Sequence, residues 1–433
     1  MNILMVTNTY KPIMGGLEKS IEVFTNGYRK RGHRVIIIAP EFKDMEPEKD
    51  LIRVPAIQNF NGTDFSVQLP LASGLTEALG DFIPDIVHSH HPFLVGDTAL
   101  RLAYKFNAPL VFTHHTLYEQ NTHYVAGDSE MMKNFVVQLA TGYANLVNQV
   151  FAPSQSVREL LQQRGVITSI EVVPTGIDLE RFAKADTKKI RATLAVPESA
   201  FVIGHLGRLA PEKNLEFMAR AVKYFLDKKR DAHFLVVGKG PSEEALEKMF
   251  VEAGLKDRLH LTGPLAGQEL VDAYHAMDVF AFASQSETQG LVLAEAMASG
   301  VPVVAVDAPG TREVVRDKIN GRLIEKEDAD DFAAALEWVA KQPEEAREKI
   351  KKECLETAEI FEVEKSIERA LTIYGTLVSD KGLVQKQRAA DSAWEKGLRV
   401  IQAQLDLTKN LAKATTSAIL HTSSSEIIEK DGR

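Results

Sequence analysis

The sequence predicts an α/β protein built from two doubly wound domains, each with a parallel sheet between layers of helices. The chain has 433 residues, which allows two or three domains. Short β-branched runs alternate with helical segments from the first residues onward, and the alternation begins again after a polar stretch near residue 185. Hydrophobic residues make up 45% of the chain and charged residues 26%, so each domain can bury a core.

The first domain, residues 1–185, opens as a strand, a helix and a second strand. We expect the first strand over residues 3–6, the helix over 17–31 and the second strand over 35–39. Further strands of the same apolar kind are expected over residues 85–88, 110–113, 150–153 and 171–174. Because near-continuous apolar strands separated by helices are buried on both faces, the sheet should be parallel.

The second domain, residues 186–360, repeats this alternation. Its strands are expected over residues 201–206, 233–237, 259–261, 279–283, 302–306 and 322–324. Two such domains leave a cleft where the carboxyl ends of both sets of strands can face each other, and open α/β sheets bind ligands at those ends.

Residues 361–433 are predicted to be C-terminal helices, crossing back to the first domain, followed by a tail. An amphipathic helix is predicted over residues 391–411, with apolar residues at Trp394, Leu398, Ile401, Leu405 and Leu407. Its charges are of both signs, which favours a packing or oligomer helix over a membrane contact.

Composition excludes several classes of protein. The chain has 51 basic and 60 acidic residues, a net charge of -9, which argues against nucleic acid as a partner. The single cysteine, Cys354, cannot close an internal disulfide, and its charged neighbours predict a position on a helix surface. The sequence shows neither a secretory signal pattern nor an apolar stretch long enough to span a bilayer. We therefore expect a cytoplasmic protein, with membrane contact limited to the periphery of the inner face.

Two loops after predicted strands carry groups suited to a phosphate. Gly15 and Gly16 precede the first helix, where glycine lets a ligand approach the backbone and the helix-start amides favour an anion. The alternative is a tight turn that needs positive φ. In GRLAPEKN, residues 207–214, Arg208 and Lys213 offer a fork donor and a point charge for a diphosphate. The alternative there is a pair of solvated charges near a helix start.

A third loop, within residues 283–305, places two carboxylates near a helix start. Gly290 should open a helix running to about residue 299, leaving the amides of Gln289, Gly290 and Leu291 as unsatisfied donors. Glu287 precedes this helix and Glu295 lies within it, in an apolar setting that predicts burial. Simple capping by a helix-start glutamate is the alternative. The glycine turn in residues 236–244 lacks the third glycine of a dinucleotide fingerprint and the lysine-serine ending of a Walker loop, so both are rejected.

Histidines gather after two neighbouring strands. Six of the twelve histidines lie in one stretch of the chain: His88, His90, His91, His114, His115 and His123. A metal centre completed by Asp97 or Glu119 is one interpretation, although no familiar ligand spacing occurs. Hydrogen bonding to a hydroxylated substrate is the interpretation we favour.

Taken together, these loops resemble those of the retaining nucleotide-sugar glycosyltransferases of family 4, whose two Rossmann-like domains form the GT-B fold. The resemblance covers residues 1–378. Its most specific part is Glu287, seven intervening residues and Glu295, followed by AMASGVPVVA, and the RLAPEKN and PIMGGLE loops support it. It implies that the first domain lies on the acceptor side and that the second binds the nucleotide sugar.

The resemblance implies a set of site residues. Donor binding is assigned to Gly15, Gly16, Arg208, Lys213, Glu287, Gln289, Gly290, Leu291 and Glu295. Catalysis is assigned to His115, Arg208, Lys213 and Glu287. In this assignment Arg208 and Lys213 hold the diphosphate, Glu295 binds the ribose, and His115 lies near the transferred sugar. In the implied front-face mechanism the leaving phosphate takes the acceptor proton, so no separate base is required. Arg208, Lys213 and the helix-start amides supply the positive potential at that phosphate, so neither a metal nor a cofactor is expected.

A narrower resemblance concerns the acceptor. SETQGLVLAEAMASG and THHTLYEQNTHY are similar to the branch of the family that glucosylates 1,2-diacylglycerol, which implies UDP-glucose as donor, a lipid acceptor and a role in glycolipid biosynthesis. Alternatives are a transferase for a saccharide acceptor in surface polysaccharide or glycan synthesis, a nucleotide-sugar 2-epimerase, an inactive scaffold and a histidine-metal hydrolase. The basic run YRKRGHR, residues 28–34, is either an anionic-membrane contact or a solvated helix end.

Overall fold

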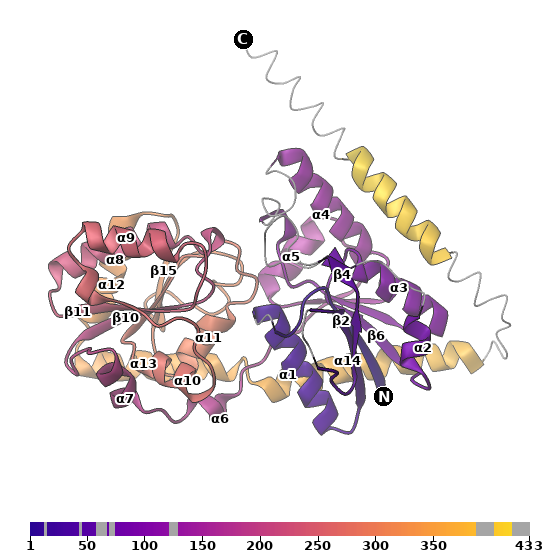
Figure 1. Cartoon of the computed structure of the whole chain (residues 1–433), viewed down its shortest axis with the longest axis horizontal. Helices are drawn as coiled ribbons and strands as arrows, with labels where there is room; N and C mark the ends of the chain where they lie inside the picture. The colour runs from indigo at the N-terminus through magenta and orange to yellow at the C-terminus, as the bar shows by residue number, and fades with distance from the viewer. Residues whose placement is uncertain are drawn as a thin grey trace, which may run out of the picture. The chain divides into compact units, whose positions relative to one another are not determined.

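The computed structural model describes residues 1–12, 15–42, 46–57, 67–68, 74–120, 129–386 and 402–417. The chain divides into two compact units (Figure 1). Unit 1 comprises Met1–Pro174 and Ser366–Arg433, and unit 2 comprises Thr175–Lys365. The polar stretch near residue 185, where we expected the domains to meet, therefore lies inside unit 2, where α7 (Thr187–Thr193) packs against α10 (Gly267–His275).

Unit 1 contains a seven-stranded parallel sheet. Its strands are β1 (Asn2–Val6), β2 (Arg34–Pro40), β3 (Leu51–Val54), β6 (Ile86–Ser89), β7 (Leu110–Thr113), β8 (Gln149–Ala152) and β9 (Ile170–Val172), in the order β3-β2-β1-β6-β7-β8-β9. A short antiparallel pair joins β4 (Ala56–Ile57) and β5 (Val67–Gln68). The strands that we expected in this unit are confirmed to within one or two residues at each end. The sequence did not predict β3, β4 or β5.

Helices cover both faces of this sheet. They are α1 (Gly16–Lys30), α2 (Leu75–Leu79), α3 (Val95–Phe106), α4 (Glu130–Ala144), α5 (Gln155–Gln163) and, from Ser366 on, α14 (Val363–Lys386). Leu4 and Val6 point into the core shared with α2 to α5. On the opposite face Met5 meets Thr25 of α1, and Tyr28 of α1 contacts Tyr374 of α14. Strand residues thus alternate between two layers, as a doubly wound sheet requires.

Unit 2 repeats the plan with a six-stranded parallel sheet. Its strands are β10 (Phe201–Leu206), β11 (Ala232–Val237), β12 (Leu259–Leu261), β13 (Val279–Phe282), β14 (Val303–Val306) and β15 (Gly321–Ile324), in the order β12-β11-β10-β13-β14-β15. All six expected strands are confirmed to within one residue at each end.

The helices of unit 2 lie on both faces of its sheet (Figure 1). They are α6 (Leu179–Phe182), α7, α8 (Leu215–Lys228), α9 (Glu243–Glu252), α10, α11 (Leu291–Ala298), α12 (Ala329–Ala340) and α13 (Glu344–Glu359), with short 3-10 turns at Pro211–Lys213 and Lys256–Arg258. Val202 and Phe280 pack on the face with α10, α11 and α13. Their neighbours Ile203 and Ala281 pack on the face with α8, α9 and α12.

The C-terminal region is helical and part of it packs on unit 1. A last helix, over residues 402–417, has Ala403 in the unit 1 core, and the Asn410 side chain donates to the carbonyl of Leu139 (3.1 Å). Leu405 is 48% exposed, so only one side of this helix is buried. These contacts agree with a packing helix, while residues 391–401 of the expected helix lie outside the described residues. Within the part of the chain that the structure describes, no helix combines the length and apolar composition needed to cross a membrane.

The predicted surface position of Cys354 is wrong. Cys354 is fully buried on α13, where Ile350, Thr357 and Ala358 share its face and pack toward α11. Its thiol lies 3.3 Å from the carbonyl of Asn320. Burial raises the pKa of this thiol well above its ordinary value.

Candidate donor and acceptor loops

Both sheets have a point at which the strand order reverses, and the predicted loops lie there. In unit 1 the loops after β1 and β6 flank this point, and in unit 2 the loops after β10 and β13 do. Open α/β sheets bind ligands at such points, outside the carboxyl ends of the strands. The loop of Gly15 and Gly16 follows β1, that of Arg208 and Lys213 follows β10, and that of Glu287 follows β13.

The loop after β10 is held firmly against its neighbour. Leu209 and Ala210 are fully buried, and the Leu209 amide donates to the carbonyl of Lys239 in the loop after β11 (3.1 Å). Arg208 and Lys213, on either side of this anchor, are half-buried. The backbone that carries the two cations is therefore fixed by packing rather than left in solvent.

The loops after β10 and β13 are joined by side chains. Lys213 Nζ lies 3.5 Å from Glu287 Oε2, and Ser284 Oγ donates to the carbonyl of Glu212 (3.0 Å). The side-chain amides of Asn214 and Gln285 both donate to the carboxylate of Glu327, in the turn before α12. The structure thus brings Lys213 and Glu287 together, as a common site for the two loops requires.

The carboxylate of Glu287 accepts hydrogen bonds from two of the helix-start amides. Its Oε1 accepts from the backbone nitrogens of Gln289 (3.3 Å) and Gly290 (3.1 Å). Burial would raise the pKa of this carboxyl, but Lys213 and the two amides outweigh it and hold the pKa below its ordinary value. The expectation that these amides are unsatisfied is wrong for Gln289 and Gly290, because a charged oxygen of the same loop reaches them first.

Gly290 has a conformation that demands glycine. Its φ is +78°, and a Cβ there would lie 2.8 Å from the carbonyl oxygen of Gly310.

The Gln289 side chain links the loop to the first residue of unit 2. It accepts from the Thr175 amide (2.8 Å) and donates to the Thr175 carbonyl (2.6 Å). Sequence reasoning missed this link, since Thr175 lies 114 residues away.

Glu295 is buried on α11, as its apolar neighbours predict. It is 2% exposed, and its Oε2 accepts from the hydroxyl of Tyr274 on α10 (2.9 Å). Tyr274 is itself fully buried. A buried polar group needs a hydrogen-bond partner, and Tyr274 holds the Glu295 side chain in one orientation.

The glycine pair after β1 does not form the tight turn with positive φ that was the alternative interpretation. Gly15 has φ of -134°, and neither Gly15 nor Gly16 has a positive φ. Among the described residues, nothing lies within 4 Å of the position that a Cβ at Gly16 would take. The Gly15 amide is satisfied by Glu18 Oε2 (2.8 Å), which also caps α1. Neither its conformation nor a contact with the described residues requires glycine at position 16.

The histidines after β6 and β7 pack together as neutral rings. His90 Nδ1 lies 2.9 Å from His115 Nε2, and the His88 and His90 rings stack with centroids 4.3 Å apart. Burial lowers the pKa of His88 to about 3 and takes those of His90 and His115 well below the ordinary value. In the described residues of these two loops and of the loop after β1, buried atoms without a hydrogen-bond partner are His90 Nε2, His114 Nδ1 and Tyr118 OH, and Asn8 Oδ1 after β1. Such atoms suit contact with a polar ligand.

The metal-centre interpretation finds no support in these residues. Among those described, no three histidine, cysteine, aspartate or glutamate side chains converge as metal ligands would. Glu119, one proposed ligand, instead accepts from the guanidinium of Arg164 (2.5 Å). His123 lies outside the described residues. Asp328, directly before α12, caps that helix, since its Oδ1 accepts from the amides of Asp330 and Asp331.

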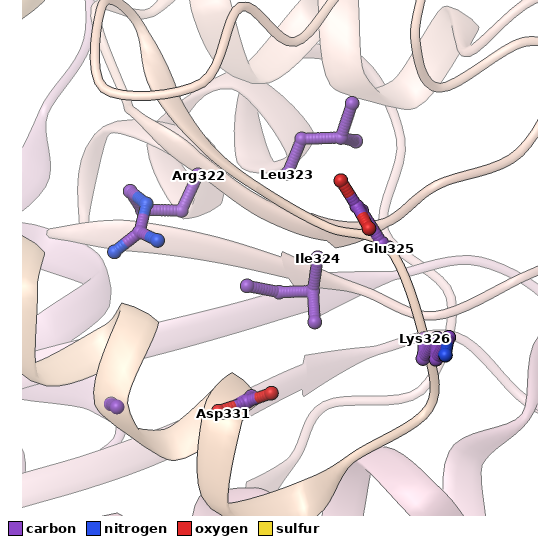
Figure 2. Close-up of a pocket in the computed structure, with 7 residues that line it drawn as sticks. Arg322, Leu323, Ile324, Glu325, Lys326 and Asp331 are labelled. Atoms are coloured by element: carbon purple, nitrogen blue, oxygen red, sulfur yellow. The ribbon is translucent and has the colours of Figure 1, made fainter.

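A pocket elsewhere in unit 2 contains none of the predicted site residues. Figure 2 shows it beside β15 and the start of α12, with Ile324 between Leu323 and Asp331. Its lining is Arg322, Leu323, Ile324, Glu325, Lys326, Asp331 and Ala334. Arg322 is already bonded to Asp317 through Nε (2.7 Å). We therefore place the candidate site at the loops after the strands and not in this pocket.

Two doubly wound parallel-sheet units with loops of this kind define the GT-B class of fold. The sequence matches "Glycosyltransferase Family 4" over residues 14–181 and "Glycosyl transferases group 1" over residues 186–356. The chain belongs to the family 4 glycosyltransferases. The predicted fold and family are thereby confirmed.

Curated relatives differ in the sugars and acceptors that their names state. The chain is 31% identical to the alpha-monoglucosyldiacylglycerol synthase of Streptococcus pneumoniae, over 75% of each chain. It is 28% identical to the GDP-mannose-dependent alpha-mannosyltransferase of Corynebacterium glutamicum, over 78% of this chain and 80% of the relative.

A solved structure supports the fold independently. Anabaena HepE in complex with UDP aligns with a TM-score of 0.70 at 20% identity, covering 87% of this chain and all of that one.

Proposed function

We propose that this protein is a retaining, metal-independent hexosyltransferase that moves glucose from UDP-glucose to a lipid acceptor of the 1,2-diacylglycerol class. The observation that carries the proposal is the ion pair between Lys213 and Glu287, which joins the loops after β10 and β13 where the strand order of unit 2 reverses. The name of the pneumococcal relative supports glucose and a diacylglycerol product. The lipid acceptor implies work at the inner face of the cell membrane by a cytoplasmic protein.

The donor is assigned to the loops described above. Arg208 and Lys213 hold the diphosphate, and Glu295 binds the ribose through its carboxylate. Gly16 leaves room for the phosphate beside the start of α1. Gly15, Gly290, Leu291 and the Gln289 amide complete the donor contacts, with the Glu287 carboxylate displaced from the amides toward the sugar.

The reaction needs no separate base. The bond between the sugar C1 and the β-phosphate oxygen breaks, and its electron pair leaves with the phosphate. The new bond forms from the acceptor oxygen to C1 on the same face, and the departing phosphate takes the acceptor proton. Arg208 and Lys213 stabilise the charge that develops on the phosphate. His115 lies near the sugar as a neutral group, because burial keeps its pKa well below the ordinary value.

The decisive experiment offers purified protein a panel of nucleotide sugars with diacylglycerol or soluble saccharides. We expect an α-linked glucosyl lipid from UDP-glucose, identified by mass spectrometry and by the anomeric proton in NMR. Transfer to a saccharide alone would favour the polysaccharide alternative, which the mannosyltransferase relative supports. Release of a free sugar epimer without acceptor would instead identify a 2-epimerase.

Transfer should survive removal of divalent metals. Positive side chains, rather than a metal, are assigned to the leaving phosphate, so EDTA should leave the rate unchanged. Loss of activity in EDTA with recovery in Zn²⁺ or Mn²⁺ would contradict metal independence.

Glu295→Ala should mainly weaken donor binding. A lost hydrogen bond to a charged group is worth roughly 1.5 to 3 kcal/mol, so the Kd for UDP measured by calorimetry should rise about 10- to 150-fold. Turnover at saturating donor should change less. Glu295→Gln, which keeps the shape and one acceptor oxygen, is the matched control. UDP binding unchanged in both variants would remove Glu295 from the ribose site.

The basic run at the end of α1 is largely engaged within unit 1. Arg29 Nη2 donates to the Val35 carbonyl (2.8 Å), Arg31 lies 3.9 Å from Glu368, and Arg34 lies 3.5 Å from Asp81. These contacts favour the second interpretation of this run, a helix end whose cations complement the helix dipole, over a membrane contact.

Changing Arg29, Lys30 and Arg31 to Gln should therefore leave vesicle binding unchanged. Each free basic residue near an anionic surface contributes about 1 kcal/mol, so a docking role would show as a salt-sensitive loss. Sedimentation with anionic and neutral vesicles at low and high salt makes the comparison. Weaker sedimentation of the variant would assign docking to this run. No sedimentation of the unmodified protein would favour a soluble acceptor.

A further inference from the structure

The contact between His90 and His115 constrains where each ring carries its proton. The two rings lie after the neighbouring strands β6 and β7, with His90 Nδ1 2.9 Å from His115 Nε2. Burial lowers the pKa of both rings well below the ordinary value, so each is neutral and carries a single proton. A hydrogen bond between two ring nitrogens requires one donor and one acceptor, which leaves two arrangements.

The other nitrogen of His90 distinguishes between them. His90 is 1% exposed, and its Nε2 has no hydrogen-bond partner. If His115 were the donor, the only proton of His90 would sit on Nε2 as a buried N–H without an acceptor. If His90 is the donor, Nε2 holds only an unused lone pair. Orphaned buried N–H groups are the rarer of these two states.

We propose that His90 donates from Nδ1 to His115 Nε2 and thereby fixes His115 as the tautomer protonated at Nδ1. His90 is then a positioning residue, and any hydrogen bond that His115 donates, including one to a sugar hydroxyl, comes from Nδ1. This use of His115 rests on the proposed function. The tautomer itself does not.

Further contacts hold the His90 ring in place. It stacks on His88 with an interplanar angle of 27°. His88 in turn is fixed from both nitrogens, by Thr113 Oγ1 (2.6 Å) and by the hydroxyl of Tyr374 on α14 (2.5 Å). His90 therefore has little freedom to turn its unpaired nitrogen toward His115.

The test uses the full-length protein with ¹⁵N-labelled histidine. Ring nitrogen chemical shifts report the tautomer, and a His115→Gln variant assigns the signals. We expect His115 to be protonated at Nδ1 in the unmodified protein. His90→Asn, whose side-chain nitrogen replaces Nδ1 as a donor, should preserve this form, and His90→Leu should lose it. His115 protonated at Nε2 in the unmodified protein would overturn the proposal.

Turnover provides a second readout. His90→Leu should lower kcat about tenfold, the effect of one neutral hydrogen bond, and His90→Asn should restore most of it. Equal losses in two folded variants would show that the donated proton is not what matters at position 90. Unchanged turnover in His115→Ala would instead remove His115 from the proposed function, while the NMR result would still decide the tautomer.

Discussion

Arg208→Ala and Lys213→Ala should each slow glycosyl transfer about 30- to 1,000-fold. Under the proposed function, each change removes one charge-assisted contact to the leaving diphosphate, worth roughly 2 to 4 kcal/mol in the activation free energy. The loop that carries them is anchored by buried Leu209 and Ala210, so the backbone that positions the two cations is already fixed. Lys213→Ala has a second effect, because it leaves the carboxylate of Glu287 without its ion-pair partner.

The measurement is kcat and KM for transfer, with melting temperature as a check on folding. Arg220→Ala and Lys248→Ala are matched controls, since both residues are exposed cations, on helices α8 and α9, and each forms an ion pair one helical turn away. The controls should retain full activity. Full turnover in both folded loop variants would remove the donor diphosphate from this loop.

Glu287→Ala should lower kcat about 100-fold without weakening UDP binding. The carboxylate is assigned to the reacting sugar, so its loss raises the barrier to transfer. In the ligand-free protein it also occupies the amides of Gln289 and Gly290 and pairs with Lys213. Removing it frees these positive groups for phosphate, so the Kd for UDP should stay the same or fall.

Glu287→Gln separates the two effects. Glutamine keeps an oxygen that can accept from the amides but removes the negative charge beside Lys213. Turnover should fall in both variants, whereas tighter UDP binding should be larger in Glu287→Ala. A weakened affinity for UDP with normal kcat would show that Glu287 binds the nucleotide and not the reacting sugar.

Much of the fold could be predicted from local patterns because its strands are short, apolar and buried on both faces. Residues 201–206 and 259–261 match β10 and β12 at both ends. The strand β3 was missed because it lies at the sheet edge and is interrupted by Arg53. Cys354 was placed on the surface because its sequence neighbours are charged. The buried residues of α13 nevertheless have the spacing of one helix face: Ile350, Cys354, Thr357 and Ala358.

Local patterns predicted which loops after the strands carry the candidate site residues, but not the contacts that these residues make. Glycine, charge and position after a strand identified the loops of Arg208 and Glu287. The partners of the site residues have no local signal: Tyr274 lies 21 residues from Glu295. Capping by Glu287 depends on a side-chain rotamer, which sequence spacing permits but does not require.

The buried Cys354 makes the protein suitable for site-directed labelling. It is the single cysteine in the sequence, it is fully buried, and its raised pKa keeps it protonated, so thiol-directed dyes should leave it unmodified. Cysteines introduced at exposed Ile83 in unit 1 and exposed Lys248 in unit 2 would then be the reactive positions. Energy transfer between dyes at this pair, recorded with and without UDP, would compare the separation of the two labelled positions in the two states.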